Sequence, residues 1–72
     1  MIRMLDDLIR GQEQKLWETA RRIVPHITPD DLLQPNDFPK LEMNPYFRHE
    51  EGILDGLRMA KAALQAEKMS TL

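Results

Sequence analysis

The stretch LLQPNDFPKLEMNP, from Leu32 to Pro45, decides the fold because it separates two long segments with helical periodicity. It holds three of the five prolines of the chain, and Pro25 and Pro29 lie just before it. Proline disfavours the helical conformation of the preceding residue and suits the first position of a new helix. The prolines therefore predict that one long helix ends near Pro25 and a second begins near Pro45.

The region between them, residues 25–44, is predicted to be a structured connector rather than a flexible linker. Thr28 is a good N-cap for a short turn over residues 29–34, and Asp37 could cap a second turn over residues 39–43. Four apolar side chains are spaced to pack against the long helices: Leu32, Leu33, Phe38 and Leu41. We expect a rigid corner of one or two short helical turns.

Both flanking segments show the three-four spacing of amphipathic helices. The first predicted helix covers residues 2–24, with a stripe formed by Ile2, Leu5, Ile9, Gln12, Leu16, Thr19 and Ile23. The second covers residues 45–68, capped by Asn44, with a stripe formed by Tyr46, Glu50, Ile53, Leu57, Ala60 and Leu64. Residues 69–72 are expected to fray.

These elements predict a single all-α domain over residues 1–72, built as an antiparallel helical hairpin. In the expected register Leu16 faces Leu57 and Trp17 faces Gly56. The chain has no cysteine, so disulfides cannot supplement so small a core. Further apolar residues lie off the main stripes: Leu8, Val24, Leu54 and Met59. We therefore expect the hairpin to form a homodimeric four-helix bundle.

Gly52 and Gly56 lie one turn apart in the second helix, where glycine costs about 0.5–1 kcal/mol relative to alanine. They suggest a close helix contact, either around Trp17 within one chain or between two chains. The candidate helix-packing interface comprises Leu16, Trp17, Ala20, Gly52, Ile53, Gly56, Leu57 and Ala60.

Three of the four aromatic residues gather at the end of the connector, beside an excess of acidic side chains. The cluster either closes the end of the hairpin or forms a partner-binding surface. The candidate surface comprises Asp37, Phe38, Leu41, Met43, Tyr46 and Phe47. A basic partner protein would complement its charge.

The chain shows no motif for catalysis or phosphate binding, so we expect neither an enzyme nor a cofactor. His49 and Glu50 are adjacent, point about 100° apart on a helix, and predict no metal site. The first helix mixes acidic and basic residues, and the formal net charge is −2. A nucleic-acid-associated regulator and an amphipathic protein of membrane surfaces are the alternatives. The best prediction is a cytoplasmic, non-catalytic protein–protein interaction or scaffold module.

Overall fold

The computed structural model describes residues 1–70, except for the side chains of Asn36 and residues 68–70. Two long helices, α1 (Ile2–Ile23) and α3 (Pro45–Ser70), are joined by a connector. The connector contains the 3₁₀ turns η1 (Asp31–Leu33) and η2 (Pro35–Asp37) and the short helix α2 (Pro39–Glu42). The all-α class and the order of a long helix, a connector and a second long helix are thereby confirmed.

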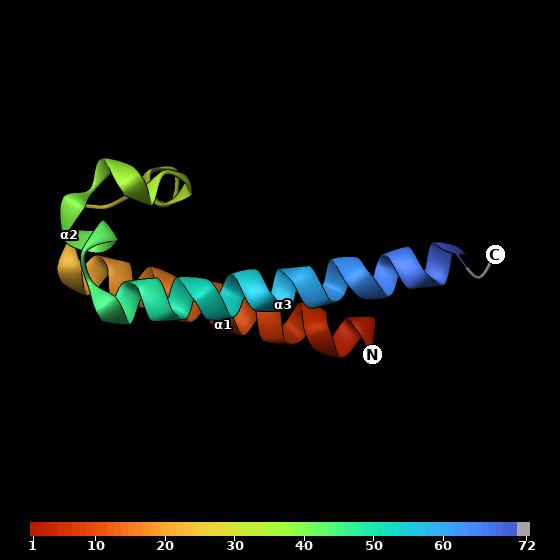
Figure 1. Ribbon diagram of the computed structural model, residues 1–72. Helices are drawn as coiled ribbons and strands as arrows, with labels where there is room; N and C mark the ends of the chain where they lie inside the picture. The colour runs from red at the N-terminus through yellow and green to blue at the C-terminus, as the bar shows by residue number, and fades with distance from the viewer. Residues whose placement is uncertain (71–72) are drawn as a thin grey trace.

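Helices α1 and α3 run side by side in opposite directions, so the start of α1 and the end of α3 lie toward the same end of the hairpin (Figure 1). Lys61 pairs with Asp6 at 2.6 Å and Arg58 with Glu13 at 3.4 Å, which ties the two helices together along their length. The result is an elongated molecule of 46 × 21 × 19 Å. The connector covers only the part of the hairpin near its closed end (Figure 1).

The helix boundaries follow local capping chemistry. The Asn44 side-chain oxygen accepts hydrogen bonds from the backbone N–H groups of Tyr46 and Phe47, both at 3.0 Å, as an N-cap should. Helix α3 continues through Ser70, two residues beyond the expected end at Lys68. Helix α3 thus includes residues 69 and 70 of the expected tail, and residues 71–72 lie outside the described residues.

Within the connector, Thr28 and Asp31 form a reciprocal cap. The Thr28 hydroxyl accepts from the Asp31 N–H at 3.2 Å, and the Asp31 carboxylate accepts from the Thr28 N–H at 3.0 Å. The predicted role of Asp37 is wrong: α2 begins after Phe38 and has no side-chain cap. Pro35 begins η2, because proline at the first helical position loses no hydrogen bond.

The core lies mainly where the connector meets the hairpin. Phe47 and Leu41 are the largest fully buried side chains, one from the start of α3 and one from α2. The other buried apolar residues are Ile9, Leu16, Ala20, Ile27 and Leu54. The connector therefore supplies part of the core through Leu41, with Leu32 and Phe38 packed against it, but the expected packing of Leu33 is wrong because it is 80% exposed.

The expected register is wrong by about one helical turn. Leu16 lies beside Leu54 rather than opposite Leu57, and Thr19 contacts Glu50 directly. Helix α3 is also rotated about its axis, since Leu54 is 4% exposed whereas Ile53 is 39% exposed. Burying Phe47 explains the rotation: its ring can leave water completely, whereas the neighbouring Tyr46 keeps its hydroxyl in solvent. Leu54 lies two turns further along the same side of α3.

Candidate functional site

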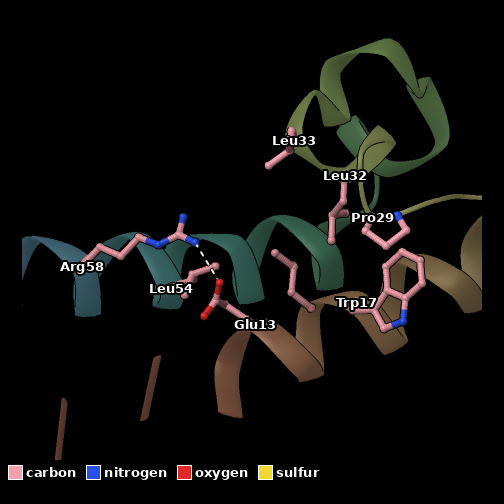
Figure 2. Close-up of a pocket in the computed structure, with 8 residues that line it drawn as sticks. Glu13, Trp17, Pro29, Leu32, Leu33, Leu54 and Arg58 are labelled. Atoms are coloured by element: carbon pink, nitrogen blue, oxygen red, sulfur yellow. Dashed lines mark hydrogen bonds and ion pairs between the residues drawn. The ribbon is translucent and has the colours of Figure 1, made fainter. Parts of the chain in front are cut away.

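Two apolar surfaces lie on opposite sides of the hairpin. The first, which we call the connector groove, is a hollow of about 370 Å³ between η1 and the two long helices (Figure 2). Pro29 and Leu32 of the connector lie above Trp17 of α1 in this view. The lining is completed by Glu13, Leu16, Leu33, Leu54 and Arg58.

Charged groups frame the connector groove. The ion pair between Arg58 and Glu13 crosses from α3 to α1 at the end of the groove away from the connector (Figure 2). The Arg21 guanidinium lies over the Trp17 ring, 5.7 Å from its centroid, a distance at which the cation is attracted to the ring face. Leu33 is 80% exposed and borders the groove without closing it.

The second surface, which we call the open face, lies on the other side of the hairpin. Thr19 and Trp17 are two residues apart on α1, which places them about 200° apart around the helix axis. Trp17 faces the connector, whereas Thr19 contacts Glu50 on the far side. The open face consists of Leu8, Gln12, Lys15, Thr19 and Arg22 of α1 and of Tyr46, Glu50, Ile53, Leu57, Ala60 and Leu64 of α3, each set sharing one side of its helix.

Three polar residues of the open face, Gln12, Thr19 and Glu50, are paired within the chain. The Thr19 hydroxyl donates to the Glu50 carboxylate, with distances of 2.8 and 3.0 Å to its two oxygens. The Gln12 side-chain amide donates to the Glu50 backbone carbonyl at 2.9 Å. These bonds join α1 to α3. The apolar surface beside them lies along α3 and is bordered on the α1 side by Lys15 and Arg22.

Much of that apolar surface has no cover. Leu8 is 50% exposed and Tyr46 is 76% exposed, while Leu57 and Leu64 are half-buried. The α3 residues are those of the predicted packing stripe. Because α3 is rotated, α1 covers only one edge of the stripe and leaves the rest in solvent.

The predicted helix-packing interface divides into two groups. Leu16 and Ala20 are buried, and Trp17 and Leu57 pack against the core. The other four are exposed: Gly52, Ile53, Gly56 and Ala60. A Cβ atom added at Gly52 or Gly56 would meet nothing within 4 Å, so the expected close contact of Trp17 with Gly56 within the chain is wrong. The rotation of α3 and the connector above Trp17 together explain the difference.

The predicted partner-binding surface also divides. Leu41 and Phe47 are fully buried, and Phe38 is half-buried against the core, so these three close the end of the hairpin. Leu41 and Phe47 are therefore not available as docking residues. Exposed residues remain at Asp37, Met43 and Tyr46.

The connector groove was not foreseen from the sequence. In the sequence, Pro29 indicated only the start of a helical turn and Leu33 only a residue that packs. The groove forms because the connector folds back over the long helices, which the sequence does not show. For the open face the sequence did give a signal, since Gln12, Thr19 and Glu50 are polar positions within otherwise apolar stripes. Their mutual contact required the true register of the helices.

His49 is exposed, and the described residues include no group of three or more side chains arranged to hold a metal ion. Nor does any described ion pair join Glu50 or Glu51 to the nearby Arg21 or Arg22. Glu51 pairs instead with Arg48 at 3.0 Å, one turn earlier in α3.

Comparisons with protein families, curated proteins and solved structures found no match to this chain. Among the described helices, none combines the length and apolar character needed to cross a membrane. The functional interpretation therefore depends on the two surfaces themselves.

Proposed function

We propose that this protein is a non-catalytic interaction module that self-associates as a homodimer. The proposal is supported mainly by the solvent-exposed surface area of the chain, which is large for its mass. The chain exposes 5643 Å². A compact folded monomer of 8.4 kDa would expose about 4,600 Å². The surplus of roughly 1,000 Å² is comparable to the ~800 Å² that each partner buries in a standard protein interface.

The shape of the molecule supports the same proposal. Its radius of gyration is 14.3 Å, whereas a compact domain of 72 residues would have about 11 Å. Two helices side by side can bury only one stripe each, and a second pair of helices completes the bundle. A dimer would thus supply the core that one short chain lacks.

The connector end is proposed to contact a partner protein. Met43 and Leu33 are exposed there, with Asp30, Asp37 and Glu42 exposed around them. Exposed methionine and leucine within an acidic surface suit a partner that offers an apolar side chain flanked by basic residues. The long helices would then act as the scaffold that holds this end in place.

Sedimentation equilibrium over a range of protein concentrations tests self-association. We expect a mass of twice 8.4 kDa at micromolar concentrations, falling toward 8.4 kDa on dilution. A mass of 8.4 kDa throughout the range would overturn the proposed dimer. For the connector end, Met43→Lys should reduce the binding of a basic amphipathic test peptide without changing the oligomeric mass of the protein, and unchanged binding would count against this surface.

A further inference from the structure

We infer that the open face is the surface through which two copies associate, with the open face of one hairpin packed on that of the other. This inference rests on the proposed self-association and adds where it takes place. It identifies the occupant of the open face as a second copy of this chain. The reasons are the difference between the two sides of the hairpin, the pairing of polar groups and the area available.

The two sides of the hairpin differ in what already covers them. On one side of the hairpin, the connector covers the closed end. Further from the closed end on that side, the ion pairs Arg58–Glu13 and Lys61–Asp6 link the two helices. The open face has no covering segment within the described chain. Its α3 row continues for about five turns, from Tyr46 to Leu64, as a stripe in which Glu50 is the one charged residue.

Burial of the open face would strand few polar groups. The Thr19 hydroxyl and the Gln12 amide N–H already donate to Glu50, so a second hairpin can cover these donors without leaving them unpaired. The Glu50 carboxylate keeps its charge, and Arg22 borders the same hollow. Tyr46 lies at the end of the row, where its hydroxyl can remain at the wet rim of an interface. The face is thus suited to a contact with an apolar centre along α3 and a charged, polar rim.

A second copy is favoured over an unrelated partner because one contact of standard size accounts for most of the surplus area of the whole chain. The surplus exposed area of the chain is roughly 1,000 Å², which one isologous contact of standard size would use almost completely. Two hairpins stacked face to face make a four-helix bundle in which the stripe on each α3 gains the cover that α1 alone does not give. The glycine side of α3, at Gly52, lies outside this contact.

Charge substitutions locate the interface. Leu8→Glu and Ile53→Glu place a carboxylate within the open face, Ile53 near its centre and Leu8 toward its open end, and each should raise the dimer dissociation constant by at least about tenfold. Met59→Glu and Leu33→Glu are matched controls, because both residues are exposed and apolar but lie off this face. Both controls should leave the dissociation constant within about twofold of the native value. Circular dichroism of each variant confirms that the helices remain.

A second measurement avoids charge in the core. The chain has no cysteine, so a single thiol can be introduced and followed without background. Ala60 lies on the open face, and Ala62 lies about 200° away on the same helix, both exposed in the single chain. Ala60→Cys should react with a maleimide several-fold more slowly than Ala62→Cys when the protein is dimeric. The two rates should converge on dilution to the monomer.

The outcomes separate the two proposals. If the native protein is a monomer at every concentration, both the dimer and this interface are overturned. If it is a dimer but Leu8→Glu and Ile53→Glu behave like the controls, or the two thiols react alike in the dimer, self-association stands and the open face is overturned. Dissociation by the open-face variants alone, with selective protection of the thiol at position 60, supports the inference.

Discussion

At the scale of single residues, the bond between Thr19 and Glu50 is the most informative contact of the molecule. Thr19 is buried, and its hydroxyl is shared between both Glu50 carboxylate oxygens. A hydrogen bond to a charged group contributes about 1.5–3 kcal/mol when buried, and the partial exposure of Glu50 lowers this to about 1 kcal/mol. A double-mutant cycle of Thr19→Val and Glu50→Ala, measured by urea denaturation, should show that coupling.

The ion pair between Glu13 and Arg58 provides the comparison for this cycle. Its side chains are 47% and 53% exposed, and the atoms are 3.4 Å apart, so its coupling should be only a few tenths of a kcal/mol. Equal coupling in the two pairs would contradict the assignment of Thr19 and Glu50 as the main polar lock between the helices.

Gly52 gives a second prediction at this scale. An added Cβ would meet nothing within 4 Å, and the residue lies within a helix and outside the proposed interface. Gly52→Ala should therefore raise the free energy of unfolding by about 0.5–1 kcal/mol, since alanine has the higher helix propensity. Thermal denaturation at fixed protein concentration measures it. A loss of stability would show that another surface approaches Gly52 closely.

At the scale of elements, the connector is the part whose role the structure defines most sharply. Two leucines of the connector differ in burial: Leu41 is fully buried, whereas Leu33 is 80% exposed. Leu41→Ala should lower stability by about 2–5 kcal/mol, the usual cost of an emptied leucine site in a core. Leu33→Ala should change it by less than about 0.5 kcal/mol. Denaturant titrations that gave the two variants similar small effects would make the connector a loose linker after all.

At the scale of the whole molecule, stability and association should be coupled. Anything that binds only the folded chain raises its apparent stability, so a homodimer should melt at higher temperature as its concentration rises. A series of calorimetric scans over a hundredfold range of concentration measures this, and Leu8→Glu should lower the melting temperature and abolish the trend. A melting temperature independent of concentration in the native protein would mean that the single hairpin is stable alone.

The sequence by itself determined the local structure. The all-α class, the helix that stops before Pro25, the cap at Asn44 with the start of α3 at Pro45, and the Thr28 turn all follow from interactions between near neighbours. Proline geometry and side-chain caps act within one helical turn, so their effects on helix ends can be predicted directly from the sequence. The burial of Leu41 and the partial burial of Leu32 and Phe38 also follow from the spacing of apolar residues in the connector.

Only the tertiary structure decided how the two helices face each other. A stripe with three-four spacing tells which residues share a side of a helix but not how far the helix is rotated against its partner. The competition between Tyr46 and Phe47 for the core set that rotation and moved Ile53, Gly52 and Gly56 into solvent. The connector groove and the open face both follow from it, because each depends on contacts between segments far apart in the sequence.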